Sequence, residues 1–197
     1  MNVYDFDNTI YDGESSFDFF IYCLKRKPSL AKFLLPTIVT LIEYKTCIIS
    51  TEGLTEKCEK YMDGFLSKLD SPKKTVKEFW DSHEHKIKPF YKKIQKPDDV
   101  IISASNDFFL EEICKRLGIK NLIASKVDLE NCRVVYLCHN EAKVRLFKER
   151  FPNDTVDNFY TDSLNDLPMI MLAKKAYLVK GEKLTEIKKE NLKSHRR

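Results

Sequence analysis

Glycine is scarce in this sequence, with five residues among 197. Neither G-x-x-x-x-G-K-S/T nor G-x-G-x-x-G occurs anywhere in the chain. Those glycine-rich turns allow a backbone to approach the phosphates of a nucleotide closely. Their absence argues against a P-loop enzyme and against a dinucleotide-dependent enzyme.

The cysteines lack the spacings of a redox or zinc site. They form no C-x-x-C pair, and no histidine cluster accompanies them at zinc-ligand spacing. The six are Cys23, Cys47, Cys58, Cys114, Cys132 and Cys138. The chain also starts without the basic and apolar leader of a secreted protein. We therefore expect a cytoplasmic protein with free, mostly buried thiols.

A large charge imbalance and a long apolar run are also missing. Lys and Arg number 34 and Asp and Glu number 30, which gives a net charge of +4 and does not predict a nucleic-acid partner. The apolar stretch 33–42 is about half as long as a bilayer crossing requires. We expect it to be part of a buried helix, and a helix lying on a membrane surface is the alternative.

Short apolar segments alternate with helical patterns along most of the chain. Strands are expected over residues 2–6, 100–103, 121–125, 155–160 and 176–180, the last closing the sheet, with a strand or hairpin within 127–137. Helices are expected over residues 107–117, 140–150 and 163–172. This alternation predicts a doubly wound, mostly parallel α/β sheet with helices on both faces.

A helical block separates the first strand from the second. Its helices are expected over 15–26, 29–47 and 54–69 and from Ser71-Pro72 to His83. Ser15 or Ser16 is the expected N-cap of the first helix, and Pro36 predicts either a kink in the second helix or a later start of that helix. We therefore expect an α/β core domain of residues 1–13 and 90–197, with a helical cap domain of residues 14–89 inserted after the first strand.

Polar side chains recur where the expected strands end. They are Asp5, Asp7 and Thr9 after the first strand, Ser103, Ala104 and Ser105 after the second, Lys143 near a helix start, and Asp162, Asn165 and Asp166 after the strand at 155–160. Ligands of doubly wound sheets bind beyond the carboxyl ends of the strands. These residues are therefore expected to lie at one edge of the sheet and to form one site.

The chemistry of this set suits a doubly charged oxyanion and a metal ion. Carboxylates from Asp5, Asp7, Asp162 and Asp166 are hard oxygen ligands of the kind that Mg²⁺ prefers. Such a cation would allow Asp5 and Asp7 to coexist despite their like charge. A hydroxyl at Ser103 and an ammonium at Lys143 could both donate to phosphate oxygens.

The ordered combination resembles the haloacid dehalogenase superfamily. D-x-D-x-T follows the first strand, a lone Ser follows the second core strand, and a Lys and then D-x-x-x-D complete the set. A helical insertion after the first of these motifs is similar to the phosphoserine-phosphatase-like branch. The resemblance implies a Rossmann-like core and a Mg²⁺-dependent phosphatase that acts on a small phosphorylated metabolite, with no nucleic-acid or membrane partner.

The resemblance also implies a role for each residue. Asp5 would be the nucleophile that forms an aspartyl-phosphate, and Asp7 would be the general acid and then the base. The metal would be held by Asp5, Asp162, Asp166 and the backbone carbonyl of Asp7. The phosphate-binding set would be Thr9, which orients the Asp5 loop, with Ser103, Ala104, Lys143 and Asn165.

Two features bear on the turn geometry and on the substrate. Asn8 stands where the family usually has glycine, and asparagine tolerates the left-handed backbone that this turn requires. Glu14 lies nine residues beyond Asp5, where phosphoserine phosphatases have a glutamate that contacts the substrate amine. It could instead be an acid favoured at a helix N-terminus. A lipid-headgroup phosphatase and a catalytically silent scaffold are the alternative functions.

Overall fold

The computed structural model describes residues 1–33, 36, 39, 40, 43, 48, 51–131 and 133–193. Its strands are β1 (Asn2–Tyr4), β2 (Val100–Asn106), β3 (Asn121–Asp128), β4 (Arg133–Tyr136), β5 (Asn158–Thr161), β6 (Lys175–Lys180) and β7 (Lys183–Glu186). Its helices are α1 (Ser15–Arg26), α3 (Thr51–Leu66), α4 (Pro72–His83), α5 (Pro89–Ile94), α6 (Asp107–Leu117), α7 (Glu141–Arg150), α8 (Leu167–Leu172) and α9 (Glu190–Lys193). Three 3₁₀ turns are η1 (Pro28–Leu30), η2 (Glu84–Lys86) and η3 (Leu164–Asp166).

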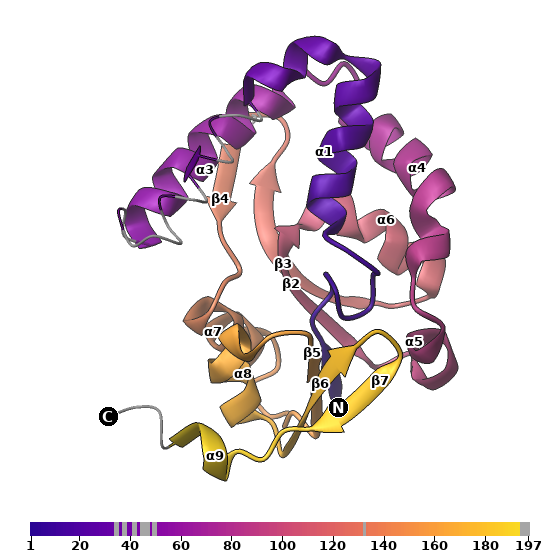
Figure 1. Ribbon diagram of the computed structural model, residues 1–197, viewed down its shortest axis with the longest axis vertical. Coiled ribbons are helices and arrows are strands. Elements are labelled where there is room, and N and C mark those ends of the chain that lie inside the picture. Colours follow the sequence, from indigo (N-terminus) through magenta and orange to yellow (C-terminus); the bar gives the residue numbers. More distant parts are fainter. Residues whose placement is uncertain are drawn as a thin grey trace.

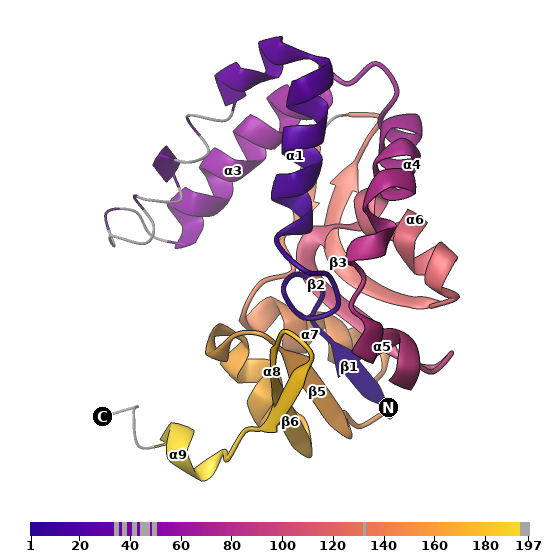
Figure 2. The same cartoon turned by 45° about the vertical axis from the view of Figure 1, so that its right-hand side comes forward.

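Within the described residues, the strands form one seven-stranded sheet in the order β4-β3-β2-β1-β5-β6-β7. Strand β1 lies at its centre and pairs in parallel with β2 and β5. Strands β3 and β6 continue the parallel pairing, while β4 and β7 add antiparallel edges. Figure 1 labels the other six strands and Figure 2 labels β1, and the arrangement confirms the predicted α/β fold with a mostly parallel sheet.

Apolar side chains of the central strands alternate between two buried layers, because successive residues of a strand point to opposite faces. Val3 packs with residues of α7 and α8, whereas Tyr4 packs with residues of α4, α5 and α6. The same alternation holds for Ile102 and Ile101 on β2. Helices therefore cover both faces of the sheet, as Figures 1 and 2 show.

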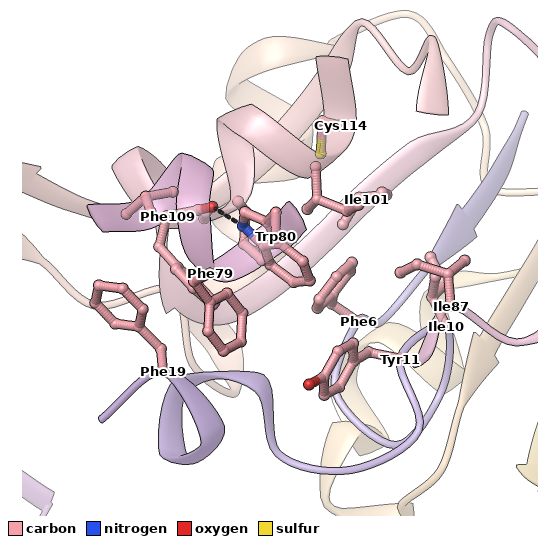
Figure 3. Close-up of a cluster of buried hydrophobic side chains, with 14 of the residues drawn as sticks. Phe6, Ile10, Tyr11, Phe19, Phe79, Trp80, Ile87, Ile101, Phe109 and Cys114 are labelled. Carbon is pink, nitrogen blue, oxygen red and sulfur yellow. Dashed lines mark hydrogen bonds between the residues drawn. The ribbon is translucent and has the colours of Figure 1, made fainter. Parts of the chain in front are cut away.

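The inserted helices are joined to the sheet by an aromatic cluster (Figure 3). Trp80 of α4 is fully buried, and its ring lies edge-on to the rings of Phe6 and Tyr11 at 6.0 and 5.7 Å between centroids. Its indole N–H donates to the carbonyl oxygen of Phe109 at the start of α6, at 2.9 Å. Aromatic edge-to-face packing and a satisfied indole N–H together hold α4 against the core.

Several predicted boundaries are confirmed. Ser71 is the N-cap of α4 with Pro72 as its first residue, and α6 ends at Gly118, whose φ of 72° is left-handed. Stretch 127–137 forms part of the β3–β4 hairpin. The predicted kink at Pro36 lies outside the residues that the structure describes in enough detail to judge it.

Two local predictions are wrong. The N-cap of α1 is Glu14, because Ser15 already has helical geometry and forms the first helical residue. Strand β6 does not close the sheet, because the chain turns at Gly181 with φ 60° and returns as β7. Glycine reaches this left-handed backbone without steric cost, so a tight reversal is possible there. Among the described residues, no helix is long and apolar enough to cross a membrane.

Candidate active site

Three predicted site residues are joined by one buried ammonium group. Nζ of Lys143 donates to Oδ1 of Asp5 at 2.9 Å and to Oδ1 of Asp166 at 2.7 Å. The lysine side chain is 4% exposed and the two aspartate side chains are 12% and 10% exposed. An ion triplet this well buried is costly to assemble, so its presence at the carboxyl edge of the sheet indicates a specific purpose.

Local structure explains how these residues meet. Asp5 directly follows β1, and its backbone N–H donates to the carbonyl of Tyr160 on β5 at 2.9 Å. Lys143 lies in the first turn of α7, and Asp166 ends the η3 turn. The hydroxyl of Thr161 donates to Oδ2 of Asp166 at 2.9 Å and fixes that carboxylate. Three segments after β1, β4 and β5 thus converge on one point.

The electrostatics of the triplet are unbalanced toward negative charge. Burial raises the pKa of Asp5 to about 7, although the nearby Lys143 ammonium opposes this rise. Burial also disfavours the charged form of Lys143, but the carboxylates of Asp5 and Asp166 outweigh burial and raise the pKa of Lys143. The lysine is therefore charged at neutral pH, whereas the pKa of Asp5 lies close to neutral pH.

Asp162 adds a further oxygen donor beside the triplet. It is partly buried, and burial, with a smaller contribution from Asp166, raises the pKa of its carboxyl. Among the described side chains, no group of three or more Asp, Glu, His or Cys is placed so that it could hold a metal ion. Mg²⁺ usually takes only one or two carboxylates and completes its shell with water and substrate oxygens. The side chains of Asp5, Asp162 and Asp166 offer carboxylate oxygens, which is the ligand type that Mg²⁺ takes, but as placed here they do not form a complete metal site.

The carboxylate of Asp7 makes contacts separate from those of the triplet. Oδ1 accepts a hydrogen bond from the backbone N–H of Ser15 at 2.6 Å, and Oδ2 accepts one from the hydroxyl of Ser105 at 2.7 Å. Asn8, the next residue, has φ 54°, and its N–H donates to the carbonyl of Gly13 at 2.9 Å. The prediction that Asn8 would adopt the left-handed turn is confirmed.

Ser103 and Ala104 lie toward the carboxyl end of β2. Ser103 is 1% exposed, and its Oγ accepts the backbone N–H of Ser105 at 3.1 Å. Ala104 is exposed, and its carbonyl accepts the hydroxyl of Ser125 at 2.6 Å. The hydrogen bond from Ser125 fixes the backbone of β2 at Ala104, between Ser103 and Ser105.

Three other predicted site residues lie outside the hydrogen-bonded triplet of Asp5, Lys143 and Asp166. Thr9 is fully buried, and its hydroxyl has no hydrogen-bond partner among the residues that the structure describes. Asn165 is exposed, and its backbone N–H donates to Oγ of Ser163 at 3.1 Å. Glu14 is exposed, and its Oε1 accepts a hydrogen bond from Asn8 Nδ2 at 2.6 Å. Substrate roles for these three residues stay predictions.

Sequence reasoning assigned no role to two residues that contact the site. Ser105 was singled out only by its place after Ser103, yet its hydroxyl reaches Asp7. Lys88 lies 80 residues beyond Asn8 in the chain, and its buried ammonium donates to the Asn8 carbonyl. Burial lowers the pKa of Lys88, and the carboxylate of Asp12 opposes this shift. No pattern in the sequence marks Lys88, whereas a second serine beside Ser103 is a signal that could have been used.

Comparison with known proteins gives one family and a group of similar structures. Residues 3–171 match the family described as haloacid dehalogenase-like hydrolase. No curated protein sequence matches the chain. A protein of unknown function from Bordetella pertussis Tohama I superposes with a TM-score of 0.69 at 17% identity, over 89% of this chain and 87% of that one.

Two further structures of similar fold are named for a phosphoserine-directed activity. A phosphoserine phosphohydrolase-like protein from Francisella tularensis subsp. tularensis SCHU S4 has a TM-score of 0.58 at 16% identity, over 89% of this chain and 86% of that one. A phosphoserine phosphatase in apo form has a TM-score of 0.56 at 14% identity, over 88% and 82%. At such low identities these likenesses establish a shared fold.

Proposed function

The chain belongs to the haloacid dehalogenase-like hydrolase family, and we propose that it is a Mg²⁺-dependent phosphatase that hydrolyses a small phosphomonoester through an aspartyl-phosphate. The observation that carries this proposal is the buried contact of Lys143 with both Asp5 and Asp166. A carboxylate that attacks a phosphate dianion is opposed by like charge unless cations lie beside both groups. Lys143 is such a cation.

The reaction consists of two displacements at phosphorus. In the first, an Oδ atom of Asp5 forms a bond to phosphorus while the ester P–O bond breaks, and Asp7 gives its proton to the departing ester oxygen. In the second, Asp7 takes a proton from a water molecule, whose oxygen attacks phosphorus. The bond between phosphorus and Asp5 then breaks, inorganic phosphate leaves, and both aspartates are restored.

Other residues hold the transferring phosphoryl group. The ammonium of Lys143 and the hydroxyl of Ser103 donate to its oxygens, with Ala104, Thr9 and Asn165 as further members of the phosphate-binding set. Mg²⁺ would be held by Asp5, Asp162, Asp166 and the backbone carbonyl of Asp7. When bound, it supplies positive charge that stabilises the phosphoryl oxygens.

We assign residues 14–89 to a cap domain and residues 1–13 and 90–197 to the core domain. Support comes from the two connections between these parts, which lie side by side. The N–H of Asp12 donates to the carbonyl of Lys86, and the N–H of Lys88 donates to the carbonyl of Ile10, both at 2.8 Å. The chain thus leaves the core and returns to it at one place next to Asp7.

A small phosphorylated metabolite in the cytoplasm is the proposed substrate, and phosphoserine is the first to test. Glu14 supports an amine-bearing substrate, because its exposed carboxylate is held beside the catalytic loop by Asn8. One structure of similar fold is named a phosphoserine phosphatase. The buried free thiols of Cys23, Cys114 and Cys138 fit a reducing compartment.

The proposal is tested by hydrolysis of p-nitrophenyl phosphate with and without Mg²⁺. The native protein should turn over only with the metal, and Asp5→Asn should abolish turnover while it remains folded. Asp70→Asn is a matched control, because the Asp70 side chain is 92% exposed and forms an ion pair with Lys27 at the surface. Absence of turnover from folded native protein, on both this ester and phosphoserine, would favour the scaffold alternative.

A further inference from the structure

The side chain of Asp7 is held by two segments that are far apart in the sequence. One is the start of α1, where the backbone N–H of Ser15 donates to Oδ1 at 2.6 Å. The other is β2, where the hydroxyl of Ser105 donates to Oδ2 at 2.7 Å. Each carboxylate oxygen therefore has its own donor, and the carboxylate has a defined orientation about its Cβ–Cγ bond.

The hydrogen bonds continue beyond Ser105 to the inserted helix α1. Oγ of Ser105 lies 2.8 Å from Oγ of Ser16. A serine hydroxyl has a single proton, and that of Ser105 is committed to Asp7. When the Asp7 carboxylate is charged it can only accept, so the proton between the two serines then comes from Ser16. When Asp7 carries a proton, the same two contacts can run from Asp7 to Ser105 and on to Ser16.

We propose that Ser105 is a positioning residue for Asp7, and that Ser16 extends this control to the inserted helix α1. This inference rests on the proposed function, because it assigns Asp7 the transfer of a proton to the leaving group. Proton transfer requires the carboxyl oxygen to lie within hydrogen-bond reach of its target. Because Ser16 belongs to α1 and Ser105 to β2, the position of the Asp7 carboxyl depends on how α1 packs against β2.

The burial of these groups supports a role beyond general stability. Ser105 is 7% exposed, whereas Asp7 is partly buried and Ser16 is exposed. The contacts of Ser105 thus connect the partly buried Asp7 to the exposed Ser16 in the first turn of α1. Without these donors the carboxylate of Asp7 would be free to rotate and to bond with water.

The neighbouring serine shows a division of tasks. Ser103 accepts the N–H of Ser105 through its Oγ at 3.1 Å, which holds the backbone of β2 in a bent path at this point. Within the described residues, no hydrogen bond joins the side chain of Ser103 to Asp7, and none joins Ser105 to Lys143. Ser103 is therefore available to the phosphoryl group, while Ser105 is committed to the acid.

The test compares two esters that differ in how much they need a general acid. p-Nitrophenyl phosphate has a weakly basic leaving group, and phenyl phosphate has nearly the same shape with a more basic one. A displaced acid harms the second ester more, because its leaving oxygen needs the proton. We expect Ser105→Ala to lower kcat/KM for phenyl phosphate about tenfold more than for p-nitrophenyl phosphate.

Further variants separate positioning from structure. Ser105→Thr keeps a hydroxyl and should restore most of the phenyl phosphate activity. Ser16→Ala, at an exposed position, should give a smaller change in the same direction and does not depend on the folding of Ser105→Ala. Ser82→Ala removes a hydroxyl that donates to the Phe79 carbonyl at 2.9 Å, and should leave the ratio of the two esters unchanged.

Equal losses for both esters, or no loss, in Ser105→Ala and Ser16→Ala would overturn the inference while leaving the phosphatase proposal intact. Native protein that hydrolyses neither ester with Mg²⁺ would overturn the proposed function, and with it the role of Asp7. These two failures are distinguishable, because the second appears in the native protein before any variant is made. A ratio that changes in Ser105→Ala and recovers in Ser105→Thr would establish the positioning role.

Discussion

Replacing Lys143 with methionine tests how much the buried ammonium contributes to the stability of the folded protein. The substitution keeps much of the length of the side chain but removes the ammonium that contacts Asp5 and Asp166 at 2.9 and 2.7 Å. Removing one partner of a buried ion pair commonly costs about 3–5 kcal/mol, because the remaining charge is left uncompensated. We expect Lys143→Met to lower the free energy of unfolding at pH 8 by about that amount and to abolish turnover.

The pH dependence of this loss follows from Asp5. Its pKa in the folded protein is raised above the unfolded value, to about 7, chiefly by burial. A carboxyl with a raised folded pKa stabilises the protein fully below its unfolded pKa, and this stabilisation is lost as the pH rises through the folded pKa. Without Lys143 the pKa of Asp5 rises further, so the loss continues to higher pH.

The loss of unfolding free energy in Lys143→Met, relative to the native protein, should therefore be larger at higher pH. Each pH unit over which only the folded state holds the proton costs about 1.4 kcal/mol. The difference in unfolding free energy between native protein and Lys143→Met should grow by about 1 kcal/mol or more from pH 6 to pH 8. Urea unfolding at both pH values, without divalent cations, measures this difference.

A surface lysine provides the control. Lys174 is 65% exposed and its Nζ lies 2.6 Å from Oδ1 of Asp157, so Lys174→Met removes an ion pair of similar length from a solvated site. Exposed pairs contribute little, about 1 kcal/mol or less, and this loss should not grow between pH 6 and pH 8. The reasoning is refuted if Lys143→Met is as stable as the native protein at pH 8, or if its deficit is the same at both pH values.

Three further predictions concern the loop, the core and the metal. Lys88→Met should lower kcat, and Lys88→Arg should retain more activity, because the ammonium donates to the carbonyl of Asn8, next to Asp7. Equal kcat values in the two variants would contradict this. Trp80→Phe should lower the free energy of unfolding by about 1–3 kcal/mol, since the Phe109 carbonyl loses a donor at 2.9 Å; an unchanged urea midpoint would count against it. Mg²⁺ should raise the thermal midpoint of native protein by binding only the folded state, and calorimetry should show a smaller rise in Asp162→Asn; an equal rise would remove Asp162 from the metal ligands.

The arrangement of the site separates two kinds of acid. Asp5 and Asp166 share a buried cation, whereas Asp7 is held by hydroxyl and amide donors from α1 and β2. Groups in such different environments can hold different protonation states at one pH. The roles of nucleophile and general acid that we propose for Asp5 and Asp7 require such a difference, because the two residues lie only two positions apart.

Much of the fold and of the site is determined locally and could be predicted from the sequence. The period-two apolar segments, the Ser71-Pro72 helix start and the Gly118 helix end each depend on the preferences of a few neighbouring residues. That Asp5 and Asp166 would lie close together could be predicted because each comes after a strand, and parallel strands bring their carboxyl ends to the same edge. The left-handed backbone of Asn8 is likewise a property of the residue and its turn.

Only the tertiary structure decided which polar side chains meet across the chain. Ser105 reaches Asp7 over 98 residues and Lys88 reaches Asn8 over 80. Neither contact has a periodic or local signature, since each depends on where the inserted helices and their return connection are seated against the sheet. A sequence records the chemistry of its side chains and the local preferences of its backbone, but contacts between distant segments are selected by the packing of the whole fold.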